Sequence, residues 1–284
     1  MGETAALGRV SDFSPIAARY DATRDLPERF LLACYDRLLA RGLFPERGRV
    51  LDAGCGTGQV SLPLAARGYE ICGFDISAEM VAIAGAKLWP EWRASYRVGD
   101  VRRIPEPDAS FDAAVVSKLF QHIEGWQKAC RELIRVVRPG SPMVQINERG
   151  FFGNAVRRYF SKRADELGFT SRFLGLNPSS GAEASAFMRA EGCEVIAVDM
   201  TDLRWRSPIS HGEALDRIRD KLHAEFWYLP ADVHSRLISD TIAWVDAQPR
   251  GRETMEELRP YLQVEVFRTP AAAGASGSRA GESN

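Results

Sequence analysis

A glycine-rich turn that follows a carboxylate is the segment of this sequence best suited to bind a ligand. Asp52 ends a short apolar run, and Gly54, Gly56 and Gly58 follow it at alternate positions. Such glycines let the backbone turn sharply and let a ligand approach the main chain. A dinucleotide-binding turn would need glycine where Gln59 stands. A carboxylate at position 52 would also repel a phosphate, so the pattern favours a cationic ligand that lacks one.

Two further carboxylates, Asp75 and Asp100, also stand close after short apolar runs. These runs alternate with stretches whose apolar residues have helical spacing, which predicts βαβ units and a parallel sheet with helices on both faces. The predicted strands are 49–53, 70–74, 94–98, 111–117 and 142–147, and the predicted helices are 25–40, 57–67, 77–87 and 126–137. Ligands bind outside the carboxyl ends of such strands. We therefore expect the chemistry of this protein at residues that end the strands.

The second half of the chain is less regular. Helical patterns occur at 153–167, 180–190, 212–226 and 231–247, and strand patterns at 193–200 and 261–267 bring the predicted sheet to seven strands. Ser180 and Glu183 have the spacing of a capping box. The segment 203–260 is long for a connection within one sheet, so we expect a helical insertion or lid that faces the substrate.

These patterns predict a single α/β domain over residues 13–269, with a Rossmann-like, mostly parallel sheet, helices on both faces and an extra N-terminal helix. Residues 45–147 would form a cofactor-binding half, and residues 148–260 would include the helical part before the last strand. Residues 270–284 have no large apolar side chain, so we expect a disordered tail.

Composition excludes several classes of protein. With 284 residues, 45% of them hydrophobic and 26% charged, the chain resembles an ordinary globular protein. A net charge of -1 argues against binding dominated by nucleic-acid phosphates, although it leaves room for a local basic patch. The five cysteines form no C-x-x-C pair, which favours free thiols in a reducing compartment. Neither a signal peptide nor an apolar run of roughly 18 residues is found, so we expect a cytoplasmic protein.

The motifs together resemble those of the class I S-adenosylmethionine-dependent methyltransferases. The run from Asp52 to Gly58 is similar to that family's D-x-G-x-G-x-G signature. Asp75 matches the acid that binds the ribose, and Asp100 matches the acid that accepts from the adenine amino group. The run 131–140, which ends in Pro139 and Gly140, matches the family's helix and turn before the fifth strand. The resemblance covers residues 13–147 motif by motif and implies S-adenosylmethionine as the cofactor.

The resemblance also implies a set of cofactor contacts. A run from Tyr20 to Arg24 is similar to a Tyr-Asp-x-x-Arg segment that closes over the methionine end of the cofactor in small-molecule members; Arg24 would hold the carboxylate there or be a surface residue. The full predicted set is Tyr20, Arg24, Asp52, Gly54, Cys55, Gly56, Gly58, Asp75, Ile76, Met80, Asp100, Val101 and Ser117.

The end of the fourth predicted strand bears on the reaction. No Asn-Pro-Pro-Tyr run typical of amino-group nucleic-acid methyltransferases is present, and Ser117 stands where metal-dependent members have an acid, so we predict no metal and no nucleic-acid partner. His122 stands where many small-molecule O-methyltransferases carry a histidine, which would be a general base or a pocket wall. Phe120 and Trp205 would line the substrate pocket or belong to the core.

The prediction is therefore a methyltransferase that acts on a small molecule, at oxygen. N- or C-methylation, RNA modification and a non-catalytic binding protein are the alternatives. The sequence does not decide the oligomeric state, for which a homodimer is one option.

Overall fold

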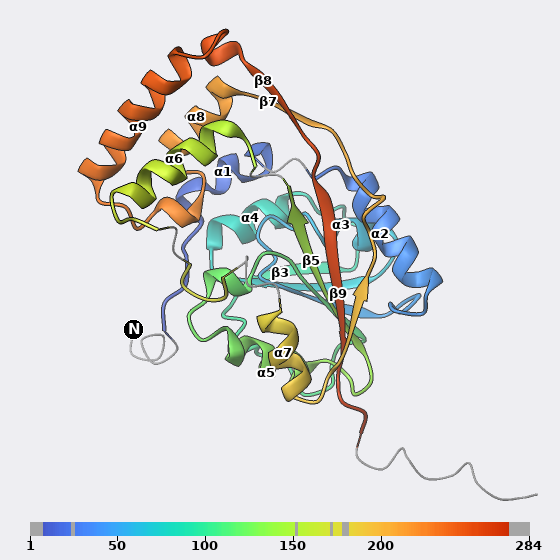
Figure 1. The fold of residues 1–284 in the computed structure, drawn as a ribbon. Coiled ribbons are helices and arrows are strands. Elements are labelled where there is room, and N and C mark those ends of the chain that lie inside the picture. Colours follow the sequence, from blue (N-terminus) through green and yellow to red (C-terminus); the bar gives the residue numbers. More distant parts are fainter. Residues whose placement is uncertain (1–7, 24–25, 151–152, 171–172, 178–181, 273–284) are drawn as a thin grey trace, which may run out of the picture.

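A seven-stranded sheet forms the main body of the protein (Figure 1). The computed structural model describes residues 8–23, 26–150, 153–170, 173–177 and 182–272. The strand order is β3-β2-β1-β4-β5-β9-β6. The first five of these strands run parallel, whereas β9 runs antiparallel to both β5 and β6. The bounds are β1 (Arg49–Ala53), β2 (Glu70–Asp75), β3 (Ala94–Val98), β4 (Ala113–Val116), β5 (Pro142–Arg149), β6 (Glu194–Val198) and β9 (Tyr261–Arg268). The predicted Rossmann-like α/β fold is confirmed.

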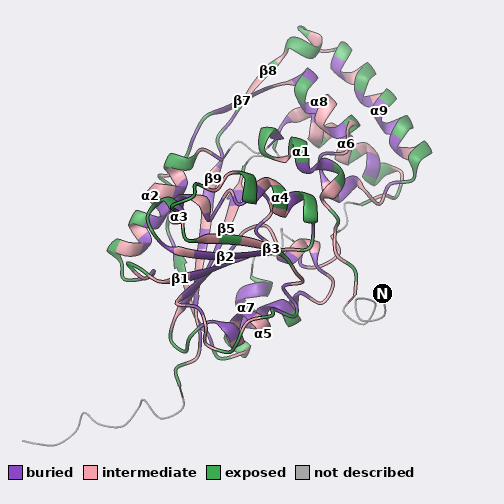
Figure 2. Ribbon diagram, turned by 180° about the vertical axis from the view of Figure 1, so that it is seen from behind, coloured by how far each residue is buried: buried purple, intermediate pink, exposed green. Residues whose placement is uncertain are grey.

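Helices cover both faces of this sheet, and Figure 2 shows the buried strands between them. One face packs on α2 (Glu28–Ala40) and α3 (Leu62–Ala66), and the other packs on α5 (Trp126–Val136) and α7 (Glu183–Ala190). All four residues of β4 are buried, because a central parallel strand meets a helix layer on each side. The Ser77 hydroxyl caps α4 (Ala78–Ala86) by accepting from the Met80 amide, as its position in the sequence predicts.

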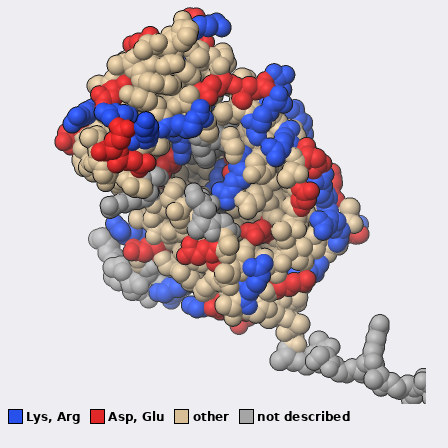
Figure 3. All heavy atoms as spheres, in the orientation of Figure 1, with Lys and Arg blue, Asp and Glu red and all other residues tan. Residues whose placement is uncertain are grey.

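A second group of helices lies beyond the carboxyl ends of the strands, at the upper left of Figure 1. This helix cluster consists of α6 (Ala155–Glu166), α8 (His211–Arg219) and α9 (Ala231–Asp246), which pack around Phe160, Leu215 and Leu237. Figure 3 shows a hollow between the helix cluster and the sheet, with basic and acidic side chains interspersed over this face.

An antiparallel ribbon of β7 (Ser207–Ser210) and β8 (Met255–Leu258) leads into the helix cluster and out of it. The expected helices of segment 203–260 are therefore present, but the sequence patterns missed both ribbon strands. Of the predicted capping box, Ser180 lies outside the described residues, as do Arg24 and residues 273–284 of the predicted tail. Within the described ranges, no helix has the length and apolar character needed to cross a membrane.

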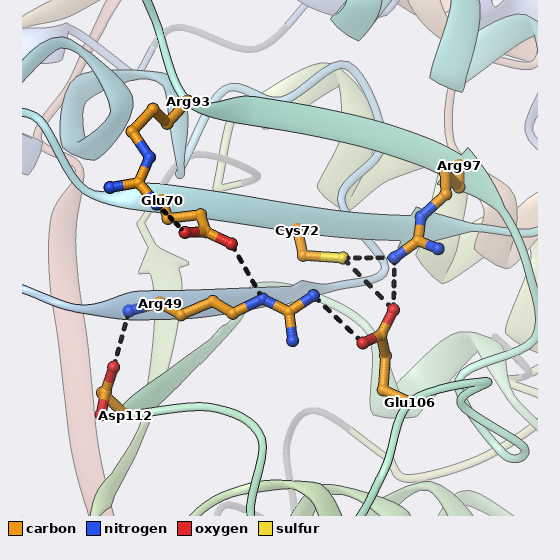
Figure 4. Close-up of polar contacts among 7 residues, drawn as sticks. All are labelled: Arg49, Glu70, Cys72, Arg93, Arg97, Glu106 and Asp112. Atoms are coloured by element: carbon orange, nitrogen blue, oxygen red, sulfur yellow. Dashed lines mark hydrogen bonds and ion pairs between the residues drawn. The ribbon is translucent and has the colours of Figure 1, made fainter.

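A network of charged residues links the first three strands to the loop after β3 (Figure 4). Arg49 donates to Glu70 at 3.1 Å and to Glu106 at 3.0 Å, and its amide donates to Asp112 at 2.7 Å. Arg97 on β3 also pairs with Glu106, whose side chain is 10% exposed. Burial alone would raise the pKa of Glu106, but the hydrogen bonds from Arg97 and Arg49 outweigh burial and lower it. This network fixes the strands whose carboxyl ends carry the site.

Candidate active site

The glycine turn after β1 adopts the conformation that its sequence predicts. Gly54, Gly56 and Gly58 have φ values of 69°, 51° and 78°, a left-handed region that favours glycine. A Cβ on Gly54 would come within 2.4 Å of the Leu119 side chain. A Cβ on Gly56 would meet no atom within 4 Å, so the main chain is open to a ligand there.

Asp75, the last residue of β2, holds this turn in place. Its carboxylate accepts from the Gly56 amide at 2.8 Å and from the Ser77 amide at 2.9 Å. Burial raises the pKa of Asp75, and these two amide hydrogen bonds oppose that rise. The carboxylate is thus positioned from two directions, with acceptor capacity left for a ligand.

Asp100 is positioned by a buried arginine two residues later. The Arg102 side chain is 1% exposed and donates to the Asp100 carboxylate through Nη2 at 2.7 Å and Nε at 3.0 Å. Its Nη1 also donates to the carbonyls of Gly8 and Glu124, both at 3.0 Å. Arg102 therefore ties the N-terminal segment to the loop that carries Asp100.

The N-terminal segment closes the site on one side. Val10 forms an antiparallel bridge with Ile123, and the Ser11 amide donates to the His122 carbonyl at 2.9 Å. The hydroxyls of Ser14 and Ser77 are hydrogen-bonded at 2.9 Å. Further along, beyond α1 (Ala17–Tyr20), the Asp21 carboxylate accepts from Thr57 and from Lys87, each at 2.5 Å.

A first cavity lies between the N-terminal segment and the carboxyl ends of β1, β2, β3 and β4. Nine of the thirteen predicted cofactor residues line it, as does the predicted catalytic His122. These nine are Tyr20, Gly54, Gly56, Asp75, Ile76, Met80, Asp100, Val101 and Ser117. The structure thus gathers residues from four strand ends and one N-terminal helix around a single cavity.

Three predicted cofactor residues do not line this cavity, namely Asp52, Cys55 and Gly58. That Asp52 faces the ligand stays a prediction, although its side chain is not part of the lining of this cavity. Its side chain is buried beneath the turn, where the Ser61 hydroxyl donates to it at 2.5 Å. Burial raises the pKa of Asp52 to about 7. In this arrangement its carboxylate is bound to Ser61 at the start of α3.

Both aromatic residues proposed for the substrate pocket belong to the core. Phe120 is 1% exposed and packs against Trp126, with ring centroids 6.0 Å apart. Trp205 is 3% exposed and packs against Phe30 on α2, with centroids 5.1 Å apart. Neither residue lines the first cavity or the second one described next, so of the two predicted alternatives the structure favours the core.

A second cavity, of about 240 Å³, adjoins the first. Its lining comes from β5, β9, α6 and η6 (Ala224–Phe226), together with the N-terminal segment and the loop after β4. Four residues line both cavities and so mark where they meet: Phe13, Tyr20, Lys118 and His122. The Phe13 and His122 rings contact each other edge to face, with centroids 4.8 Å apart.

Lys118 at this junction was not predicted from the sequence as a site residue. It has a φ of 50°, which is uncommon for a residue with a side chain, and such conformations concentrate at functional sites. Its ammonium pairs with Glu148 on β5 at 3.1 Å, and the two side chains are 17% and 1% exposed. The only sequence signal was its position directly after Ser117, at the end of β4. Among the described residues, no group of three or more His, Cys, Asp or Glu side chains is arranged to hold a metal ion.

Comparison with known proteins identifies the family. Residues 51–144 match a model described as a methyltransferase domain. The chain is 34% identical to a demethylmenaquinone methyltransferase of Thermus thermophilus over 164 residues, or 55% of this chain and 74% of that protein. It is 34% identical to a malonyl-[acyl-carrier protein] O-methyltransferase of Serratia marcescens over 46% of this chain and 48% of that one, so it spans about half of that relative.

The fold also matches a crystal structure of the YcgJ protein from Bacillus subtilis, with a TM-score of 0.55 and 19% identity over 86% of this chain and 100% of the other. The chain belongs to the class I S-adenosylmethionine-dependent methyltransferases. It is an enzyme of that class, and S-adenosylmethionine is its cofactor.

Proposed function

We propose that this enzyme transfers a methyl group to a hydroxyl oxygen of a small molecule, with the cofactor in the first cavity and the acceptor in the second. The observation that carries this proposal is the junction of the two cavities. A histidine and a lysine lie there, between the strand ends that match the family's cofactor motifs and a separate polar cavity.

The residues of the first cavity fit the cofactor. The carboxylate of Asp75 would accept from the ribose hydroxyls, that of Asp100 would accept from the adenine amino group, and the open main chain at Gly56 leaves room for close approach. When bound, S-adenosylmethionine supplies a methyl group activated by a sulfonium. The N-terminal segment, through Phe13 and Tyr20, would cover this junction and exclude water.

His122 would act at the acceptor. Its imidazole lines both cavities, so it can reach a hydroxyl held in the second one and take its proton as the oxygen is methylated. Lys118 would stabilise negative charge that develops on the same oxygen. A carboxylate acceptor would need no base, and the enzyme would then tolerate loss of His122.

C-methylation is the second candidate, because the Thermus thermophilus relative is named for demethylmenaquinone. The test uses methyl-¹³C-labelled S-adenosylmethionine with a bacterial metabolite extract, and NMR of the product. A carbon shift typical of a methyl ether or ester supports the proposal, and one typical of a methyl on carbon overturns it.

Substitution of His122 tests the role of the base. His122→Ala and His122→Gln should lower kcat by about 10²–10⁴ and leave cofactor affinity nearly unchanged, since the ring serves the acceptor. His234→Gln in α9, outside both cavities, is the matched control. A rise in KM with unchanged kcat would assign His122 to the pocket wall.

A further inference from the structure

We infer that the acceptor is a small polar molecule with several O–H or N–H donors, and that Gln145 and Glu148 on β5 recognise it. The inference rests on the proposed function, because it assigns the second cavity to the acceptor. It goes further by naming the chemical class of the acceptor and the residues that select it.

The first observation is a pair of buried oxygens. Gln145 and Glu148 both line the second cavity, and they are 6% and 7% exposed. The Oε1 atom of each has no hydrogen-bond partner among the described residues. The other carboxylate oxygen of Glu148 accepts from Lys118 at 3.1 Å. Buried acceptors are nearly always satisfied in proteins, so these two atoms call for donors from a ligand.

The second observation is a row of polar side chains where a sheet face is normally apolar. Along β5 and β9, the buried Val144, Ile146, Val264 and Val266 face one core, as alternation in a strand requires. The opposite face presents Gln145 and Asn147 on β5, and Gln263 and Glu265 on β9, and all four line the second cavity. A polar face enclosed in this way provides hydrogen bonds for orienting a ligand.

The third observation is the balance of charge. The cavity is lined by three carboxylates, Glu148, Glu225 and Glu265, and by three cations, Lys118, Arg149 and Arg157. Lys118 pairs with Glu148, Arg157 pairs with Glu225, and Glu265 accepts from the Ser185 hydroxyl. A neutral or zwitterionic ligand matches this lining, whereas a long apolar chain would leave these polar groups without water or a partner.

The experiment separates a bacterial extract into a water-soluble fraction and a lipid fraction, and offers each to the full-length enzyme with radiolabelled S-adenosylmethionine. We expect label to enter the water-soluble fraction. Without turnover, the same fraction should raise the midpoint of thermal unfolding of enzyme saturated with S-adenosylhomocysteine, because a ligand that binds the folded state stabilises it.

Two variants test the residues. Gln145→Leu removes the amide and should lower incorporation from the water-soluble fraction by about tenfold or more, as loss of one good hydrogen bond to the acceptor would. It should fold normally, because its Oε1 makes no hydrogen bond to any residue that the structure describes. Glu148→Gln should have a similar effect, although it also breaks the pair with Lys118. Gln127→Leu on α5, outside both cavities, is the matched control.

Three results would count against the inference. Label that enters only the lipid fraction overturns the polar acceptor and leaves the methyltransferase assignment intact. Unchanged incorporation and unchanged thermal stabilisation in Gln145→Leu remove that residue from acceptor recognition. Absence of label and of stabilisation with both fractions, in enzyme that binds S-adenosylmethionine, contradicts the proposed function itself.

Discussion

Asp52→Asn should remove a strong pH dependence from the stability of this protein. Asp52 is fully buried under the glycine turn, where its carboxylate accepts a hydrogen bond from Ser61 and is repelled by the negative charge of Asp75. Desolvation is the largest cause of its raised pKa, which is about 7 in the folded protein against an ordinary value of 3.8 for an aspartate. Asparagine keeps the shape and an oxygen for Ser61 but cannot ionise.

The sign of the effect follows from linkage. Below about pH 3, Asp52 is protonated in both the folded and the unfolded chain, and its contribution to stability is fully present. Between about pH 4 and pH 7 only the unfolded chain loses the proton, so the free energy of unfolding falls as pH rises. A shift of roughly three pKa units corresponds to about 4 kcal/mol, which the wild type should lose relative to the variant by pH 8.

Urea unfolding of the cofactor-free proteins from pH 4 to pH 8 measures this difference. Asp165→Asn, at an exposed site on α6, controls for loss of a carboxylate as such. We expect the wild type and Asp52→Asn to be similar near pH 4, and the variant to be the more stable protein above pH 7. If the difference between them stays constant across this range, desolvation of Asp52 is not the cause argued here.

Three further predictions concern the cofactor, a metal and the charge network. Asp75→Ala should weaken S-adenosylmethionine binding by about 1.5–3 kcal/mol, measured by calorimetry on folded protein; unchanged affinity would show that the cofactor lies elsewhere. Turnover should survive exhaustive EDTA treatment, and loss that magnesium restores would contradict the argument from Ser117. Glu106→Gln should lower the free energy of unfolding near neutral pH by about 2 kcal/mol. Since the folded-state pKa of Glu106 is lowered, its contribution is present above the unfolded pKa and lost as pH falls, so denaturant unfolding should show the two proteins converging in acid.

The sheet was predictable because a buried parallel strand needs a continuous apolar run. The bounds of β1 and β3 agree with the predicted 49–53 and 94–98. The helix predicted at 57–67 begins only at Leu62, since the glycine turn occupies its first residues. The ribbon of β7 and β8 was not predicted from the sequence. Its strands are short and half-exposed, and Pro208 and the two glutamates of β8 are residue types that are depleted in strands.

The position of a site residue was predictable from the sequence where the end of a strand determines it. It was not predictable where tertiary packing determines it. Asp75 and Asp100 lie together because parallel strands end at one edge. Phe120 and Trp205 could not be assigned from their residue type, since an aromatic side chain suits a core as well as a pocket. Gln145 and Glu148 lie in a strand that was predicted from its apolar residues alone. Their surroundings depend on β9, which lies more than a hundred residues later in the sequence.

The similarity to relatives covers the cofactor-binding part of the chain better than the part that lines the second cavity. The family model ends at residue 144. The residues that hold the glycine turn in place lie within it, and so do Asp75 and Asp100. Most of the second cavity, from Gln145 to Glu265, is built by the chain that follows. Cofactor chemistry is therefore shared with the family, whereas on the proposal made above the acceptor is selected by the helix cluster and the polar face of β5 and β9. We therefore expect substitutions at Asp75 and Asp100 to change cofactor affinity and substitutions at Gln145 and Glu148 to change the KM of the acceptor. Lys118 and His122 at the junction are the residues whose loss should affect kcat.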